Sequence, residues 1–427
     1  SLKGTVRGCG GIGMALLFLA VTGASSVFAG DPLSLNSLVE EAKKNNPEIL
    51  AARKRWEASL ARIPQAKSLE NPNVGLTFEK IPRGTLKLNA VMPEDRMLSV
   101  SQMFPFFGKL TLKGKIALVE SQMSAAELKG TELEVISEVK NTYYDLFMND
   151  KEKALRQESL SLLKGIAKIT EAKYAVAEAT QDELFKLNLE IARLSNAITN
   201  LDQERLAKET RLNSLLDRNP ESTLDAPELN EDASFSMDMK PLYQATLLNQ
   251  PELIVLSYAI EKNKFAKSLA QKSFFPDMMA GLVQRGISSG NIGPWDLMLS
   301  FSVPFWFWTK QRYEVKEAIT NLEEAEAAYQ AMRNQAFAMT KDLAVKIEIA
   351  KNKINLYRTT LKPMLESAIL SALASFQAGR GDVMVLLDNQ RMFVETKMDY
   401  YRALVEYNMN LADLERSVGT ELKGMRQ

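Results

Sequence analysis

The chain of 427 residues contains no histidine, and its single cysteine is Cys9. It therefore lacks the usual nucleophile–base pairs of enzymes and the usual ligands of zinc and copper sites. One cysteine also excludes a disulfide within the chain. We expect a protein that is not an enzyme and that holds no metal ion or other cofactor.

An excess of charge of one sign is also missing, because Lys and Arg together number 53 and Asp and Glu together number 53. Binding to nucleic acid is favoured by a positive surface, so this balance gives no reason to predict a nucleic-acid partner. Beyond residue 29 there is no long apolar run either. A membrane protein built from spanning helices is therefore not expected.

One apolar run does stand near the start of the chain, at residues 14–21. Basic residues precede it, and a small-residue cleavage pattern ends at Ala29. This order is typical of a secretory signal peptide over residues 1–29, and the mature protein is expected to be exported. A membrane anchor helix is the alternative, for which the run is short. Cys9 precedes the run instead of following it, so no lipid anchor is predicted.

Three short motifs recur in the same order about 200 residues apart. They are residues 46–49 (NPEI) and 250–253 (QPEL), residues 101–107 (SQMFPFF) and 301–307 (FSVPFWF), and residues 174–177 (YAVA) and 376–379 (FQAG). Repetition at this scale predicts two structurally equivalent halves. We assign the first repeat to 30–218, a connecting segment to 219–241, the second repeat to 242–420 and a C-terminal tail to 421–427.

Each half is predicted to contain a helix, a strand pair, a very long helix and a returning helix. Apolar residues at helical spacing indicate the first helix at 35–68, with a break or a new start at Asn46-Pro47. Alternating residues indicate strands near 74–80, 98–101, 279–285 and 297–303. The runs 108–174 and 310–376 contain at most one proline, and each predicts roughly 100 Å of helix. The returning helices carry coiled-coil spacing.

Four strands are too few for a soluble sandwich and too few for a single-chain barrel, which needs at least ~8. In a bilayer a sheet must close, because its edge groups otherwise lack partners. Several chains would therefore have to share one barrel. In the first half we expect Thr77, Glu79, Ser99 and Ser101 to face the lumen. We expect Val74, Leu76, Phe78, Leu98 and Val100 to face lipid.

Aromatic residues gather where the strands pass into the long helices. They are Phe104, Phe106, Phe107, Phe305, Trp306, Phe307 and Trp308. An aromatic belt at a membrane–water interface explains this placement; the alternative is a buried soluble core. The 19 methionines are scattered, with no Met-x-x-Met cluster at a turn. Core filling is the preferred interpretation for them, over binding of Cu(I).

With these elements in this order, the sequence resembles the TolC family of outer membrane efflux proteins over nearly the whole chain after residue 29. The motifs that carry the resemblance are residues 46–48 (NPE), 71–73 (NPN), 102–110 (QMFPFFGKL) and 376–388. The FPFFGKL run is most similar to the heavy-metal (CzcC/CusC-like) branch. That branch is the only ground for expecting heavy-metal cations among the exported solutes.

The resemblance implies a mainly α fold with a small β part. Long coiled-coil helical hairpins from a homotrimer would form an α-barrel, and four strands per chain would contribute to a 12-stranded transmembrane β-barrel. It implies a passive conduit in outer membrane lipid with a periplasmic extension, which meets a periplasmic adaptor and an inner-membrane pump of the RND type. A periplasmic coiled-coil adaptor or scaffold is the alternative function, but it gives little reason for two alternating hairpins with aromatic ends.

The resemblance also assigns roles to the two turns farthest from the strands. Asp388 matches the later of two acids that line a narrow entrance in the family. Val385 stands at the earlier position, so Asp382 is the candidate replacement, although it also suits a helix cap. Arg380 is a candidate partner for an acid of a neighbouring hairpin, where the pair would latch the closed state; the alternative is a solvated side chain. The turn residues expected to dock the adaptor are Tyr174, Ala177, Phe376, Gly379 and Gly381.

Overall fold

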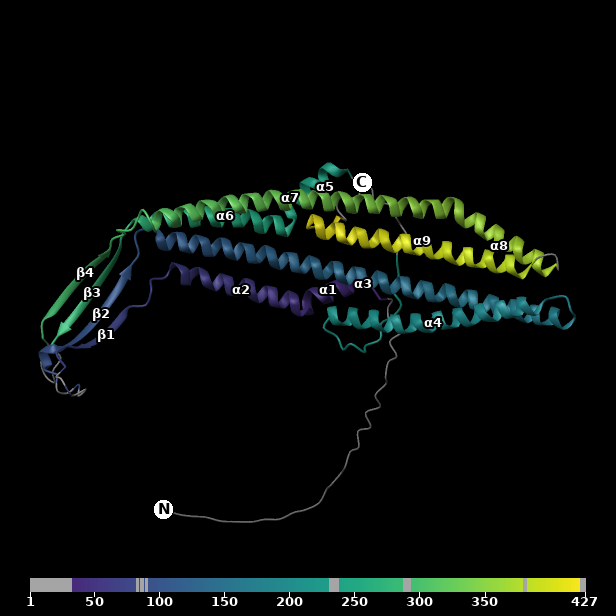
Figure 1. The fold of residues 1–427 in the computed structure, drawn as a ribbon, viewed down its shortest axis with the longest axis horizontal. Coiled ribbons are helices and arrows are strands. Elements are labelled where there is room, and N and C mark those ends of the chain that lie inside the picture. Colours follow the sequence, from purple (N-terminus) through teal and green to yellow (C-terminus); the bar gives the residue numbers. More distant parts are fainter. Residues whose placement is uncertain are drawn as a thin grey trace, which may run out of the picture.

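The computed structural model describes residues 33–81, 84, 88, 91–229, 238–286, 293–378 and 382–422. The predicted signal peptide lies outside these residues. Figure 1 shows a long bundle of helices with one sheet set at an angle at its end. The helices are α1 (Leu35–Asn45), α2 (Pro47–Lys67), α3 (Lys109–Ala175), α4 (Gln181–Leu215), α5 (Met239–Asn249), α6 (Pro251–Gln271), α7 (Gln311–Leu356), α8 (Lys362–Gln377) and α9 (Val383–Val418).

The sheet is antiparallel and has the strand order β1-β2-β3-β4. The strands are β1 (Asn73–Phe78), β2 (Arg96–Phe104), β3 (Asp277–Arg285) and β4 (Trp295–Ser302). Both predicted hairpins are present, and pairing of β2 with β3 joins the two halves of the chain. The mainly helical fold with four strands is therefore confirmed.

The predicted first helix is divided at Asn46. The side chain of Asn46 accepts hydrogen bonds from the backbone nitrogens of Glu48 (2.8 Å) and Ile49 (3.3 Å). Pro47 takes the first position of α2, where no intrahelical donor is needed. Asn46-Pro47 therefore starts a second helix instead of bending a single one.

The two long helical runs differ in continuity. Helix α3 is a single helix of 67 residues. The second run, predicted as one helix, consists of α7, a π-helical segment at Tyr357–Leu361, and α8. Pro363 lacks the N–H that an α-helix would use to bond to the carbonyl of Thr359, and this accounts for the wider turns beside it.

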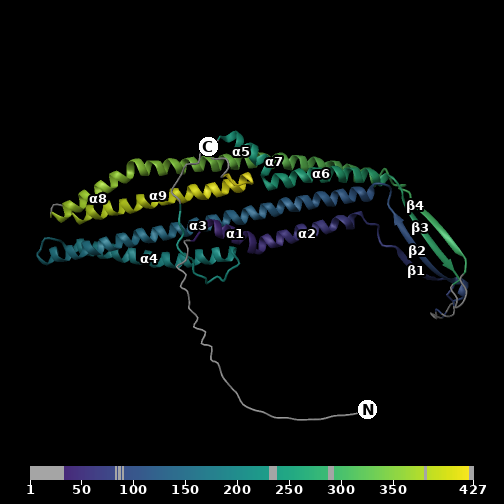
Figure 2. The same ribbon diagram turned by 180° about the vertical axis from the view of Figure 1, so that it is seen from behind.

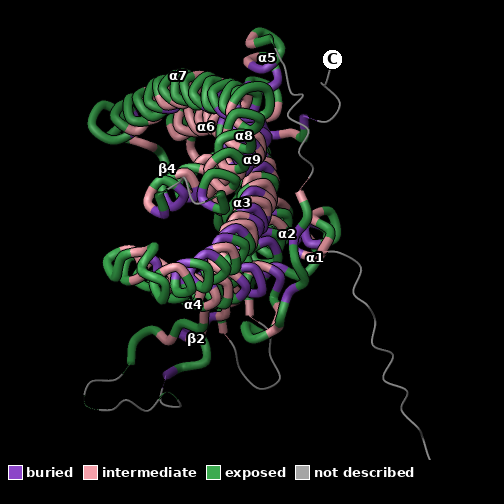
Figure 3. The backbone as a smooth tube through the Cα atoms, turned by 90° about the vertical axis from the view of Figure 1, so that its right-hand side faces the viewer, coloured by how far each residue is buried: buried purple, intermediate pink, exposed green. Residues whose placement is uncertain are grey.

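The helices form a curved layer that is open on one side. Figure 3 shows this arc along the bundle, with α1 and α5 on its convex side. In the views of Figures 1 and 2, α2 lies beside α3 and α6 lies beside α7, and both pairs are in contact. Within the described residues, no helix has a stretch long and apolar enough to cross a membrane.

Three buried clusters hold the bundle together. One lies around α1, α3 and the end of α4, and a second lies between α5, α7 and α9. The third joins the two hairpins at the end farthest from the sheet. Its members are Leu163, Ile166, Leu187, Leu194, Phe376, Val383, Leu386 and Leu387.

Candidate functional site

The sheet has one apolar face that is open to solvent in the single chain. Antiparallel pairing produces rows of side chains that cross all four strands. One row consists of Val74, Val100, Leu282 and Leu297. Val74 is 68% exposed and Leu297 is 69% exposed, although both are aliphatic. An exposed apolar surface that is continuous over four strands marks a contact with lipid or another protein.

The opposite face of the sheet is mainly polar. Thr77, Ser99 and Ser101 lie on it, together with Asp296 and Ser300 of β4. The two predicted faces of the first hairpin are therefore separated as the alternation of the sequence indicates. Glu79 lies one residue beyond the end of β1, and its backbone nitrogen donates to the carbonyl of Asp95, so its assignment to the lumenal face stays a prediction.

The predicted interface aromatics differ between the two strand-to-helix junctions. In the second repeat Phe305, Trp306 and Trp308 are all at least half exposed. In the first repeat Phe107 is 88% exposed. Phe106, in contrast, stacks on Phe275, with 4.5 Å between the ring centroids. Phe104 ends β2 and is partly exposed on the apolar face of the sheet.

A polar clamp fixes the first junction, and none of its charged residues was predicted to have a role. The Asp277 carboxylate accepts a hydrogen bond from the backbone nitrogen of Phe106 (2.6 Å) and one from the Lys109 ammonium (2.8 Å). The Lys272 ammonium donates to the carbonyl of Phe107 at 3.0 Å and lies over the Phe106 ring. These contacts join the end of β2 to the start of β3. The one sequence signal for the clamp is that Lys109 stands inside the QMFPFFGKL motif, which carries part of the family resemblance.

At the far end of the bundle, Asp382 is a helix cap. Its side chain accepts a hydrogen bond from the backbone nitrogen of Met384 at 2.8 Å, so it begins α9. Asp388 lies further along α9 and has 70% of its side chain exposed, 3.8 Å from Arg391. Asp382 thus caps a helix by bonding to its backbone, whereas the Asp388 side chain is exposed to solvent. Arg380 lies outside the described residues.

The residues predicted to dock the adaptor differ in their exposure to solvent. Tyr174 is 45% exposed at the end of α3, and Ala177 adopts a left-handed backbone with φ of 62° in the turn that follows. Phe376 is 1% exposed, in the core between the hairpins, so its side chain is not a contact surface in the single chain. Gly379 and Gly381 lie outside the described residues.

Two polar links that the sequence did not indicate connect the hairpins at this end. Arg391 of α9 donates to Glu190 of α4 at 2.6 Å. This hydrogen bond raises the pKa of the Arg391 guanidinium, so the cation is held in its charged form. Lys173 of α3 donates to the carbonyl of Phe376 and lies 4.6 Å from the centre of its ring. The ends of the two hairpins therefore form one body within the chain.

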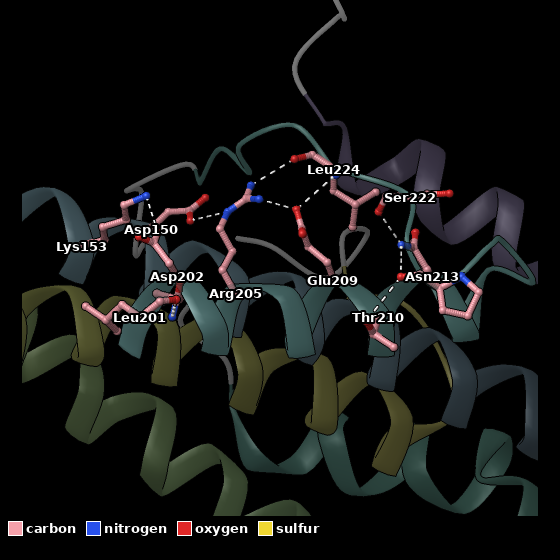
Figure 4. Close-up of polar contacts among 12 residues, drawn as sticks. Asp150, Lys153, Leu201, Asp202, Arg205, Glu209, Thr210, Asn213, Ser222 and Leu224 are labelled. Carbon is pink, nitrogen blue, oxygen red and sulfur yellow. Dashed lines mark hydrogen bonds and ion pairs between the residues drawn. The ribbon is translucent and has the colours of Figure 1, made fainter. Parts of the chain in front are cut away.

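A charged network fastens the connecting segment to the first repeat (Figure 4). Arg205 of α4 bonds to Asp150 at 2.8 Å, to the carbonyl of Leu224 at 3.0 Å, and to the Glu209 carboxylate. Glu209 in turn accepts from the backbone nitrogen of Leu224. Asn213 donates to the carbonyl of Ser222, next along the segment. The sequence pattern did not predict this anchor, because charged residues such as Arg205 and Glu209 are expected on the solvent-exposed side of an amphipathic helix.

The fold and the two-faced sheet together define a class: a duplicated helical-hairpin protein with a sheet suited to a membrane. Residues 38–218 and 242–420 match the family described as outer membrane efflux protein. The chain belongs to this family. It is a channel of an efflux system, located in the outer membrane with a periplasmic extension, and channels of this family work with adaptor and pump partners.

Individual relatives agree with this membership. The chain is 20% identical to the cobalt-zinc-cadmium resistance protein CzcC of Cupriavidus metallidurans, over 96% of this chain and 98% of that protein. Its fold is similar to that of CusC, with a TM-score of 0.78, 15% identity, and coverage of 92% of this chain and 96% of the other. The outer membrane protein VceC of Vibrio cholerae gives a TM-score of 0.76 and 16% identity, over 91% of this chain and 97% of the other.

Proposed function

We propose that three copies of the chain close into a ring in which β4 of each copy pairs with β1 of the next. Twelve strands would then enclose one lumen in outer membrane lipid, and the arcs of helices would continue it into the periplasm. Strands β1 and β4 are the two edges of the described sheet, and each can accept a partner strand. A head-to-tail contact that closes after three copies satisfies both edges.

The internal repeat supports this ring. A contact between the two repeats is made once within the chain, and the residues at the repeated positions could make the same contact only with another copy. Asp277 follows Pro276 and holds Phe106, which follows Pro105. The equivalent of Asp277 in the first repeat is Asn73, and the equivalent of Phe106 in the second repeat is Phe305. Phe305 is 71% exposed, at the side of the sheet where β4 ends. In the proposed ring it would meet Asn73 of the next copy.

The ring is proposed to serve as a passive conduit for solutes that include heavy-metal cations. Similarity to a cobalt-zinc-cadmium resistance protein and to CusC supports cations as cargo. Asp388, exposed near the far end, would bring three carboxylates together around the axis, and such rings attract cations. Arg380 is proposed to pair with an acid near this constriction, while Asp382 has its role as a cap.

The far end is also the proposed docking site of the adaptor, which would link the channel to an RND-type pump. Exposed Tyr174 and the turn around Ala177 offer the contact surface in the first hairpin, and residues 379–381 would offer it in the second. If the constriction is built as proposed, Asp388→Ala and Arg380→Ala change single-channel conductance in planar bilayers. Unchanged conductance in both variants would remove the support for these two roles.

The observation that carries the proposal is the apolar face of the sheet, and a pair of neighbouring substitutions tests it. Leu76→Arg places a charge on the face proposed to meet lipid, at a cost of ~2–4 kcal/mol near the midplane. Thr77→Arg places the same charge on the polar face. We expect Leu76→Arg to abolish detergent-resistant trimers in outer membrane fractions and Thr77→Arg to leave them. Equal trimer yields would refute the face assignment and with it the barrel.

A further inference from the structure

Methionines gather on the polar face of the sheet, where an apolar side chain has no core to fill. In the described strands, those on this face are Met97, Met103, Met279 and Met298. Met103 and Met298 are each 40% exposed. A methionine that serves as core filler is buried. The interpretation of the methionines as core filler, which the sequence favoured, therefore does not hold for these two.

Three of these methionines form one cluster across β2, β3 and β4. Met103 lies directly opposite Met279 in the antiparallel register. Residues in such a pair have their Cβ atoms about 5 Å apart, so two side chains as long as methionine are within contact distance. Met279 also pairs with Ser300, two residues from Met298, so Met298 is its diagonal neighbour on the same face. The cluster surrounds Gly281, and the Met298 methyl carbon lies 3.3 Å from the position that a Cβ on Gly281 would take.

Met97 stands apart from this cluster. It is 8% exposed and pairs with Thr77 and Arg285, near the opposite end of the strands. The neighbouring side chains at that end are a charged pair, Arg285 with Asp296, instead of further thioethers. Asp277 begins β3 on the same face as the cluster, two residues before Met279, at the end of the sheet that meets the helices.

We propose that Met103, Met279 and Met298 form a site for a soft monovalent cation of the Cu(I) or Ag(I) class, at the passage from the helices into the sheet. Thioether sulfur is a soft, neutral ligand that selects such ions over zinc or magnesium. This proposal rests on the proposed function, because the polar face must line the conduit for the site to meet exported ions. A neutral, partly exposed site would bind ions and release them again, as conduction requires.

The test is titration of the purified full chain in detergent with silver nitrate, in a chloride-free buffer, by isothermal calorimetry. Cys9 lies in the predicted signal peptide, and all proteins carry Cys9→Ser so that any uncleaved chain contributes no thiol. The site variant combines Met103→Leu, Met279→Leu and Met298→Leu. A matched control changes three methionines away from the site, Met278→Leu on the apolar face and the exposed helical Met339→Leu and Met392→Leu. Leucine keeps the volume and removes the sulfur.

We expect the site variant to lose one Ag(I) per chain, or to bind it at least about tenfold more weakly, while the control binds as the parent does. Zinc added in place of silver should show no difference among the three proteins. Equal silver binding by the site variant and the parent overturns the proposal, as does an equal loss in the control.

A second measurement needs no variant that might fold poorly. In the parent protein labelled with [13C-methyl]methionine, Ag(I) should shift the resonances of Met103, Met279 and Met298 and leave that of Met278 unchanged. A shift at Met278 as large as at the other three would overturn the site. Conductance of the parent in planar bilayers separates the two proposals: a protein that conducts without binding silver removes the site alone, whereas one that does not conduct removes the conduit.

Discussion

The two repeats share one plan, yet the junction between strand and helix is fastened by polar side chains in the first and exposed in the second. The first has a capped helix start at Asn46, a clamped junction at Phe106 and an anchored connecting segment at Arg205. In the second repeat the junction aromatics are exposed, and Gln250 makes no side-chain cap bond. At the junction the difference follows from position along the chain, because Asp277 of the second repeat is available to hold Phe106, whereas Phe305 has no following repeat to contact in the single chain.

The long helices show the same contrast in a second form. Helix α3 is continuous, whereas the equivalent run from Gln311 to Gln377 has a π-helical segment and Pro363. A π-helical segment and a proline both bend a helix, and Figure 1 shows α8 inclined to α7. The axis of the second hairpin therefore changes direction before the end farthest from the sheet. There, contacts made by Lys173 and Arg391 join it to the first hairpin.

The largest expected effect breaks the Arg205 anchor of the first repeat. In the second repeat the Glu415 carboxylate makes a similar link, because it pairs with Lys140 and accepts from the backbone nitrogen of Leu422. Arg205→Ala leaves the carboxylate of Glu209, which has 4% of its side chain exposed, without its cation. Removing one partner of a buried pair typically costs about 3–5 kcal/mol. We expect a comparable loss of stability on thermal unfolding in detergent, together with proteolysis within 219–229. Leu206→Ala, at a neighbouring exposed position, is the control and should unfold as the parent does.

The second prediction concerns the clamp and its unpartnered equivalent. Asp277→Ala removes the acceptor of Phe106 and leaves the Lys109 ammonium, 12% exposed, without its carboxylate. We expect a loss of about 1–3 kcal/mol in unfolding free energy. Asn73→Ala should cost little in an isolated chain and more in the trimer, if Asn73 meets Phe305 of the next copy. Equal effects of Asn73→Ala in both states would contradict that contact.

Much of the fold is predictable from this sequence, because helices and strands are indicated by patterns among residues that are close together in the chain. Alternation places all four strands within a few residues of their bounds, and the absence of proline gives the length of α3. The family motifs locate the turns. The Asp382 cap is indicated by its position just after Gly379 and Gly381, where a returning helix is expected to begin.

The polar links escape prediction because they join residues that the sequence keeps far apart. Asp277 and Lys109 are 168 positions apart, and Arg391 and Glu190 are 201 apart. No periodicity relates such pairs, so only the packed structure reveals them. The burial of Phe376 has the same origin, because the second hairpin covers it only after both hairpins have packed. The methionine cluster likewise depends on strand register, which pairs residues from different repeats.

The smallest expected effect compares the two helix starts. Asn46→Ala removes an acceptor for two backbone nitrogens and a donor to the carbonyl of Leu215, so it should cost about 1 kcal/mol, at most about 2. Gln250 makes no side-chain cap bond, and its buried Oε1 has no hydrogen-bond partner. Gln250→Leu is therefore expected to be neutral or slightly stabilising, because it removes an unsatisfied polar atom. Urea unfolding of both variants, followed by circular dichroism, measures the difference. A loss for Gln250→Leu as large as that for Asn46→Ala would mean that the second repeat is also held at its helix start, and the contrast between the repeats would then be confined to their junctions.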